Sequence, residues 1–131
     1  MSAHGSRRAL VVDDSRTTRR ILARMLDDLG FTVREASDGV EAMEDVARDG
    51  APEVALVDWN MPRMDGLELV RELRADTAHE HCRILMVTTE AEVERLVEAL
   101  DAGADEYAMK PFTKDVIADK LALLGVVGEA S

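Results

Sequence analysis

Five short apolar, β-prone segments alternate along this chain with longer amphipathic segments, and this alternation restricts the possible folds more than any other feature. The expected strands are Ala9–Val12, Thr32–Ala36, Val54–Val57, Ile84–Val87 and Glu106–Met109. Strands separated by helices of this length are typical of βαβ units, because two parallel strands need a crossover connection. The chain is therefore predicted to be an α/β protein, (βα)5, with a doubly wound parallel five-stranded sheet and helices on both faces.

Helix start and stop signals fall between these strands. An apolar stripe at helical spacing marks the first helix, and Gly30 is a typical C-terminal stop. The predicted core-facing residues of this helix are Ile21, Leu22, Met25, Leu26 and Leu29. Asp38 with Glu41 has the spacing of a capping box and predicts the start of the second helix. Asp65 with Glu68 predicts the start of the third helix in the same way.

The same signals continue in the second half of the chain. Thr89 with Glu92 predicts the start of the fourth helix, which would end at Gly103. The predicted apolar face of that helix comprises Val93, Leu96, Val97 and Leu100. Thr113 is the expected N-cap of the fifth helix. The inward face of the fifth helix comprises Ile117, Leu121 and Leu124.

The 131 residues suit one domain, which is expected to span residues 7–125 between short tails at 1–6 and 126–131. The net charge of −11 disfavours nucleic acids and anionic membranes as partners, since both need a basic surface. No run approaches the ~18 apolar residues of a membrane span, so membrane insertion is not expected. The single cysteine, Cys82, cannot form an internal disulfide and is expected to be a buried apolar residue. Because the N-terminus also lacks an apolar signal core, a cytoplasmic location is expected.

Polar residues follow four of the five predicted strands, at the point where each strand ends. Asp13 and Asp14 follow the first strand, Asp58 the third, Thr88 the fourth and Lys110 the fifth. In an open α/β sheet these carboxyl ends lie at one edge, where ligands bind. A parallel strand that is buried on both faces tolerates a charged side chain only where it emerges. Asp58, which follows a central apolar run, is therefore the centre of the predicted site.

Three carboxylates at one edge repel one another unless a cation lies between them. Mg²⁺ prefers oxygen ligands and takes one or two carboxylates while it retains several waters. We therefore expect Asp14 and Asp58 to be direct ligands of Mg²⁺ and Asp13 to hold a coordinated water. Lys110 is a compact cation that can pair with Asp58 or with oxygens attached to it.

This set of groups suits phosphoryl transfer, which depends mainly on positioning and charge stabilisation. Asp58 can be the nucleophile and form an aspartyl-phosphate, with one phosphoryl oxygen on the metal. Thr88 and Lys110 can hold the other two oxygens. Each residue alone has a simpler explanation, such as Asp13 or Asp14 being a helix N-cap. Their coincidence at successive strand ends favours a shared site.

Several runs around these residues are distinctive when taken together. They are Val11-Val12-Asp13-Asp14-Ser15, Asp58-Trp59-Asn60-Met61-Pro62, Met64-Asp65-Gly66, Met86-Val87-Thr88 and Tyr107-Ala108-Met109-Lys110-Pro111-Phe112. With these runs the chain resembles the receiver domains of two-component response regulators over nearly its full length, and the chemotaxis members most of all. The resemblance implies a flavodoxin-like sheet with strand order 2-1-3-4-5.

The resemblance implies that Asp58 is the phosphoacceptor for a histidine kinase or a phosphotransfer domain. It also implies that Mg²⁺ is bound by Asp14, Asp58 and the backbone carbonyl of Asn60, with Asp13 acting through a water. The chain would then be a phospho-accepting signalling protein that assists its own phosphorylation and dephosphorylation, and not an enzyme with a separate substrate.

A conformational switch is a further implication of the resemblance. The Thr88 hydroxyl would move toward the phosphoryl group, and Tyr107 would rotate into the space vacated. The surface of the fourth helix, fifth strand and fifth helix would then bind an output partner, with a flagellar switch protein as the leading expectation. The bond between Lys110 and Pro111 is typically cis in the family, so Pro111 is a candidate cis-proline.

Three residues are expected to set the lifetime of the phosphoryl group: Asn60, Thr89 and Glu90. Asn60 and Glu90 match the chemotaxis members of the family and suggest rapid self-dephosphorylation. Thr89 departs from the family, which usually has a small residue at this position. Its bulk would hinder an attacking water, so we expect Thr89 to lengthen the lifetime.

A stand-alone response regulator receiver, acting in chemotaxis or flagellar motor control, is the leading interpretation. A phosphorelay shuttle, a phosphate sink and a receiver fragment of a longer regulator are the alternatives. A Mg²⁺-dependent aspartyl phosphatase is disfavoured, because such enzymes usually carry a second Asp two residues after the nucleophile, where this chain has Asn60. Arginines concentrate on the first helix and are expected to dock an acidic partner; they are Arg16, Arg19, Arg20 and Arg24.

Overall fold

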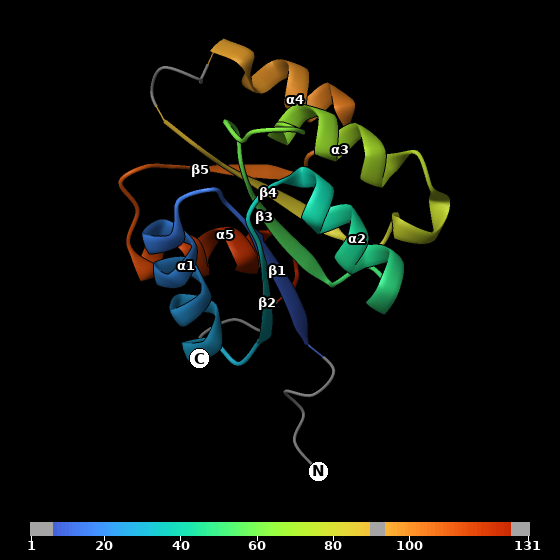
Figure 1. The fold of residues 1–131 in the computed structure, drawn as a ribbon. Coiled ribbons are helices and arrows are strands. Elements are labelled where there is room, and N and C mark those ends of the chain that lie inside the picture. Colours follow the sequence, from blue (N-terminus) through green and yellow to red (C-terminus); the bar gives the residue numbers. More distant parts are fainter. Residues whose placement is uncertain (1–6, 90–93, 127–131) are drawn as a thin grey trace.

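The computed structural model, which describes residues 7–89 and 94–126, contains one parallel sheet with strand order β2-β1-β3-β4-β5 (Figure 1). The strands are β1 (Arg8–Val12), β2 (Thr32–Ala36), β3 (Val54–Asp58), β4 (Arg83–Thr88) and β5 (Glu106–Met109). The helices are α1 (Arg16–Asp28), α2 (Gly39–Asp49), α3 (Gly66–Arg74), α4 (Leu96–Ala102) and α5 (Lys114–Leu123), with a short 3₁₀ helix η2 (Thr77–His79) before β4. The predicted (βα)5 flavodoxin-like fold is confirmed.

Helices cover both faces of the sheet, as the parallel arrangement requires. Helices α1 and α5 lie on one face, and α2, α3 and α4 lie on the other (Figure 1). On the first face the helices contribute Leu22, Leu26, Ile117 and Leu121 to the buried core. On the second face they contribute Ala42, Val46, Leu69, Val70, Leu73 and Ala99. Strand β3 is central, and all of its residues are buried, so its last residue emerges from the middle of the molecule.

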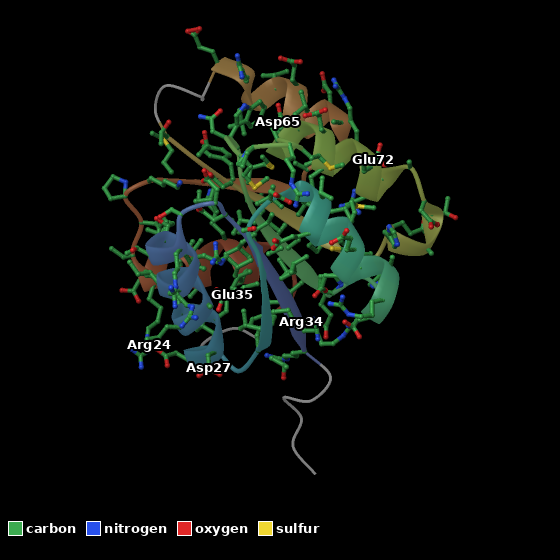
Figure 2. The ribbon with its side chains drawn as sticks, in the orientation of Figure 1. Arg24, Asp27, Arg34, Glu35, Asp65 and Glu72 are labelled. Atoms are coloured by element: carbon green, nitrogen blue, oxygen red, sulfur yellow. The ribbon has the colours of Figure 1, made fainter. Side chains whose placement is uncertain are left out.

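The capping signals in the sequence correspond to observed helix starts. At α3 both halves of the capping box form between Asp65 and Glu68, and Figure 2 shows Asp65 at that end of the helix. At α2 the Asp38 carboxylate accepts from the Glu41 backbone NH, while the Glu41 carboxylate accepts from the Ser37 NH, one residue before the cap. Each cap satisfies backbone NH groups that have no partner within the helix.

The prediction for the fourth helix was wrong in its start and in its apolar face. Helix α4 begins at Leu96, with Arg95 as its N-cap residue, so Thr89 is not its cap; Glu92 and Val93 lie outside the described residues. Val97 is 66% exposed and Leu100 is 40% exposed. Ala99 is buried in their place, together with Leu96. The helix packs mainly against one neighbour, α3, so it buries a narrower stripe than its apolar sequence suggests.

Two further predictions about burial can be compared with the structure. Ile21 was expected in the core face of α1, but it is 46% exposed, whereas Leu22 and Leu26 on that face are buried. Cys82 is buried as predicted, and burial raises the pKa of its thiol to about 12. Cys82 therefore behaves as a small apolar residue. Within the described part of the chain, every helix is too short or too polar to cross a membrane.

Candidate functional site

The residues predicted from the strand ends lie together at the carboxyl edge of the sheet. One carboxylate oxygen from each of Asp13, Asp14 and Asp58 lies within 4.8 Å of those of the other two. The Lys110 Nζ donates to Asp58 Oδ1 at 3.0 Å and lies 3.6 Å from Asp13 Oδ2. Asp13 and Asp58 are buried, and Asp14 is exposed. Three acids and one lysine from the carboxyl ends of three strands thus form a single cluster.

The turn after β1 leaves the acid pair outside the helix. Ser15, and not Asp13 or Asp14, is the N-cap of α1, where its hydroxyl accepts from the Thr18 backbone NH. The Asp13 backbone NH donates to the Ala36 carbonyl at 3.1 Å, which continues the pairing of β1 with β2 beyond the strand. Because a separate residue caps α1, the carboxylates of Asp13 and Asp14 are available to the edge of the sheet.

The turn after β3 is fixed by close backbone packing at Gly66. The Gly66 NH donates to the Trp59 carbonyl at 2.9 Å. A Cβ at position 66 would lie only 2.6 Å from the Asp58 carbonyl oxygen. No side chain larger than hydrogen fits there, because the atom that it would meet is backbone. Gly66 therefore lets α3 begin directly against the residue that carries the central carboxylate.

A second contact holds the loop between Asp58 and α3. Arg63 has a positive φ of 66°, which is uncommon for a residue other than glycine. Its guanidinium donates twice to the buried Asp38 carboxylate, at 2.7 and 3.1 Å. This hydrogen bond and the positive charge of Arg63 hold the pKa of Asp38 below its usual range. Sequence reasoning missed this pair, because nothing in the spacing of positions 38 and 63 indicates that they meet.

Burial disfavours the ionised forms of two carboxylates in the cluster, Asp13 and Asp58. Burial raises the pKa of Asp58 to about 6; the hydrogen bond from Lys110 opposes this, and the charge of Asp13 adds to it. Burial also raises the pKa of Asp13, although the Ser15 backbone NH and Lys110 counteract it. Asp13 Oδ2 is buried without a hydrogen-bond partner among the described residues. Buried carboxylate oxygens that lack sufficient donors fit a hard divalent cation such as Mg²⁺.

The ends of β4 and β5 are tied together beside this cluster. The Lys110 NH donates to the Thr88 carbonyl at 2.8 Å, and the bond from Lys110 to Pro111 is cis. The Thr88 side chain is buried, and its hydroxyl donates to the Thr89 carbonyl at 3.1 Å. Thr88 thus lies at the same edge as Lys110.

Tyr107 lies on the strand next to Thr88 and on the same face of the sheet. It pairs in register with Met86, two residues before Thr88, and side chains two apart on a strand share a face. The ring is half-buried against the core under α3 and α4, and Lys120 Nζ lies 4.8 Å from its centroid. Of the other predicted residues, Asn60 and Thr89 are exposed, while Glu90 lies outside the described residues.

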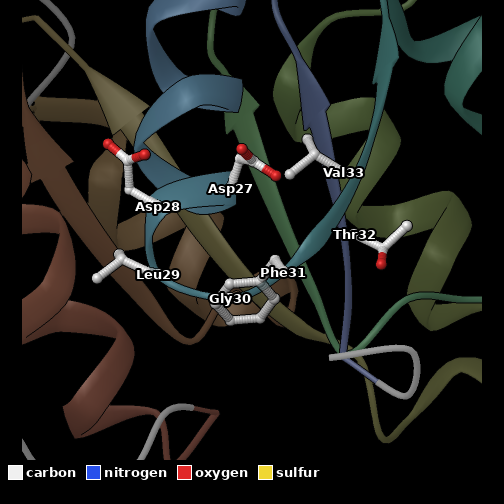
Figure 3. A pocket seen from close by; sticks show the side chains of 7 residues that line it. All are labelled: Asp27, Asp28, Leu29, Gly30, Phe31, Thr32 and Val33. Carbon is white, nitrogen blue, oxygen red and sulfur yellow. The ribbon is translucent and has the colours of Figure 1, made fainter. Parts of the chain in front are cut away.

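A hollow elsewhere on the surface is separate from this cluster. Figure 3 shows it where the end of α1 meets the start of β2. Its lining comprises Asp27, Asp28, Leu29, Gly30, Phe31, Thr32 and Val33. The start of β2 is at the amino edge of the parallel sheet, opposite the edge that carries Asp58. The hollow therefore takes no part in the chemistry of the acid cluster.

Comparison with known proteins agrees with this arrangement. Residues 9–122 match the family described as the response regulator receiver domain. The chain is 46% identical over 113 residues to chemotaxis protein CheY1 of Helicobacter pylori, which covers 86% of this chain and 91% of that protein.

Solved structures show the same likeness. Chemotaxis protein CheY4 of Vibrio cholerae superposes with a TM-score of 0.83 at 33% identity, over 90% of this chain and 98% of that one. A two-component system response regulator/GGDEF domain protein gives a TM-score of 0.85 at 29% identity, and the chain spans about half of its length (49%). The chain belongs to the response regulator receiver family and is the receiver domain of a CheY-like response regulator.

Proposed function

We propose that this chain is a phospho-receiver, in which Asp58 accepts a phosphoryl group from a histidine kinase or a phosphotransfer domain. The single observation that supports this most strongly is the position of the Asp58 carboxylate. It emerges from the central strand, 3.0 Å from the Lys110 ammonium and within reach of the Asp13 and Asp14 carboxylates. A buried carboxylate so placed is a nucleophile that faces a cation and a cluster of metal-ligand oxygens.

In the proposed transfer, one Asp58 carboxylate oxygen forms a bond to phosphorus as the bond from phosphorus to the histidine nitrogen of the donor breaks. Lys110 holds Oδ1, which leaves the other oxygen to attack. With a pKa of about 6, Asp58 is mostly ionised at neutral pH and needs no general base. Asp13, Asp14, Asp58 and the Asn60 carbonyl would hold Mg²⁺, which, when bound, neutralises charge on the phosphoryl oxygens.

Lys110 and Thr88 are proposed to hold the product. The Lys110 ammonium already pairs with the acceptor carboxylate. It can therefore donate a hydrogen bond to a phosphoryl oxygen once the phosphoryl group is attached to Asp58. The Thr88 hydroxyl can exchange its bond to the Thr89 carbonyl for one to a phosphoryl oxygen. A shift of Thr88 would free space on the sheet face that it shares with Tyr107, which is the proposed route of the signal.

Two surfaces are proposed to meet partners. The exposed output surface comprises α4, β5 and α5, where Val97 and Leu100 are apolar and open to solvent. A flagellar switch protein is the proposed occupant of this surface, as in chemotaxis. The second surface is on α1, where a shallow groove is lined by Arg16, Thr17, Arg20, Ile21 and Arg24. This groove is proposed to dock the acidic surface of a kinase or phosphotransfer domain in the cytoplasm.

Trp59 provides the test, because it is buried next to Asp58 and is the only tryptophan. Its fluorescence is expected to change on addition of Mg²⁺, and again on addition of acetyl phosphate. Asp58→Asn is the matched control, since it keeps the shape of the side chain but cannot form the acyl-phosphate. A wild type that does not respond, or a variant that responds equally to acetyl phosphate, would defeat the proposal.

A further inference from the structure

Arg19 reaches from the first turn of α1 back to the loop that carries the acid pair. Its Nη1 donates to the Asp13 carbonyl oxygen at 2.7 Å, and its Nε donates to Glu35 Oε1 at 3.0 Å. The side chain is only 15% exposed. Because a guanidinium is a rigid planar fork, two hydrogen bonds in different directions fix both the group and its acceptors. Arg19 therefore connects the end of β2 to the loop after β1.

The other side of the same loop is also held from the end of β2. The Asp13 NH donates to the carbonyl of Ala36, the residue after Glu35. Figure 2 shows Glu35 between β2 and α1, as its ion pair with Arg19 requires. The peptide groups on both sides of Asp13 thus have fixed partners, a β-type bond at the NH and the Arg19 guanidinium at the carbonyl.

We propose that Arg19 is a positioning residue for the cation site. The Asp13 carbonyl that Arg19 holds belongs to the planar peptide unit between Asp13 and Asp14. The hydrogen bond from Arg19 therefore fixes the orientation of this peptide unit, and with it the direction in which the Asp14 side chain points from the backbone. Asp14 is exposed, and packing does not fix its carboxylate in place. Because Mg²⁺ binding is part of the proposed function, the role of Arg19 rests on that function.

The charge of Arg19 and its positioning role predict opposite effects on Mg²⁺ binding. A positive guanidinium near three carboxylates repels a cation, so loss of the charge alone would tighten binding. Loss of a positioning contact would weaken binding instead. Removal of groups that orient metal ligands typically costs roughly 10- to 100-fold in affinity, and we expect about tenfold for Arg19, which acts through the backbone.

The chain contains a matched control for the charge. Arg20 is the next residue on α1, and its Nε lies 3.5 Å from the same Glu35 oxygen that Arg19 binds. Its side chain is 62% exposed, so solvent screens its charge and orders it weakly. Arg20→Met removes the same charge from the same helix, and it leaves the bond from Arg19 to Asp13 in place.

The test is a Mg²⁺ titration of the metal-free chain, followed by Trp59 fluorescence and, in parallel, by urea unfolding without Mg²⁺. Arg19→Met is expected to raise the Mg²⁺ dissociation constant about tenfold, while Arg20→Met changes it less than about twofold. Arg19→Lys keeps the charge but cannot reach both acceptors, so it is expected to weaken binding by a smaller factor. The urea midpoints separate general destabilisation from loss of affinity in the folded state.

Two results would overturn the role of Arg19: unchanged or tighter Mg²⁺ binding by Arg19→Met, whatever its urea midpoint, or equal weakening by Arg20→Met. If Arg19→Met does not fold, the Mg²⁺ affinity of Arg19→Lys is the test instead. A wild-type affinity in Arg19→Lys would then overturn the positioning role of Arg19. A wild type that does not bind Mg²⁺ would defeat the proposed function itself. Wild-type binding with unaffected variants would defeat the role of Arg19 alone.

Discussion

The Asp58 carboxylate lowers the stability of the folded chain when no metal ion is bound, even though Lys110 pairs with it. Burial raises its pKa from 3.8 to about 6, against the favourable contact with Lys110. The folded state therefore binds the proton more tightly than the unfolded state does. The contribution of this group to stability is present below pH ~4 and is lost as pH rises through about 6. The ionised Asp58 carboxylate therefore has a free-energy cost in the folded state, which a bound divalent cation can reduce.

Asp58→Asn is expected to stabilise the metal-free chain at pH 8, because it removes a buried charge. The shift of about two pKa units corresponds to a gain on the order of 3 kcal/mol in the free energy of unfolding. At pH 4 the wild-type carboxyl is largely protonated, so the gain should mostly disappear. Urea unfolding in the presence of a chelator at the two pH values measures both differences.

Asp65→Asn is a suitable control for this measurement. It removes the same charge from a partly exposed N-cap, where Asn caps about as well as Asp, so we expect a change within about 0.5 kcal/mol at both pH values. An Asp58→Asn variant that is less stable than wild type at pH 8, or one with an equal gain at both pH values, would contradict the account of Asp58.

At the scale of elements, the site depends on how closely α3 begins behind β3. Gly66→Ala would place a Cβ 2.6 Å from the Asp58 carbonyl oxygen, which cannot move without shifting the acceptor. We expect a loss of about 1–3 kcal/mol in the free energy of unfolding, which is typical of overpacking, together with weaker Mg²⁺ binding. Urea unfolding and the Trp59 titration measure the two effects.

Glu72→Ala on the exposed side of α3 is the control for Gly66→Ala. It puts the same residue into the same helix without a steric conflict, so stability should change by no more than about 0.5 kcal/mol. Wild-type stability and Mg²⁺ affinity in Gly66→Ala would show that the approach of α3 to β3 does not constrain the acceptor.

The elements also show which features the sequence could predict. Strand order came from the family resemblance, whereas the alternation of strands and helices and the α3 capping box followed from periodicity and spacing. The start and exposed face of α4 did not, since Val97 and Leu100 are apolar but face solvent. An apolar stripe shows which residues can be buried, but the neighbouring helix determines how many of them are.

For the site, the sequence predicted the acids and the lysine because they all follow strand ends, and the topology brings strand ends together. It could not predict the bond from Arg19 to the Asp13 carbonyl or the pair of Arg63 with Asp38. These contacts depend on side-chain rotamers and on the path of two loops, which leave no periodic signal. In the sequence, Arg19 is only one of four arginines on the first helix.

At the scale of the whole molecule, one sheet connects the acid cluster to the proposed output surface. Asp58 ends the central strand, Thr88 ends the next, and Tyr107 lies on the edge strand β5. The proposed signal therefore crosses two neighbouring strands to reach the face of α4, β5 and α5. The groove is lined by residues of α1 alone and includes none from α4, β5 or α5, so a phosphodonor and an output partner can occupy separate surfaces.

Intact-protein mass spectrometry after incubation with acetyl phosphate tests the phospho-receiver claim most directly. With Mg²⁺, the wild type is expected to gain the mass of one phosphoryl group, to lose it on treatment with hydroxylamine, and to map it to Asp58. Without Mg²⁺, and in Asp58→Asn with Mg²⁺, the gain should be absent. A phosphoryl group on another residue, or none on the wild type in the presence of Mg²⁺, would contradict the claim.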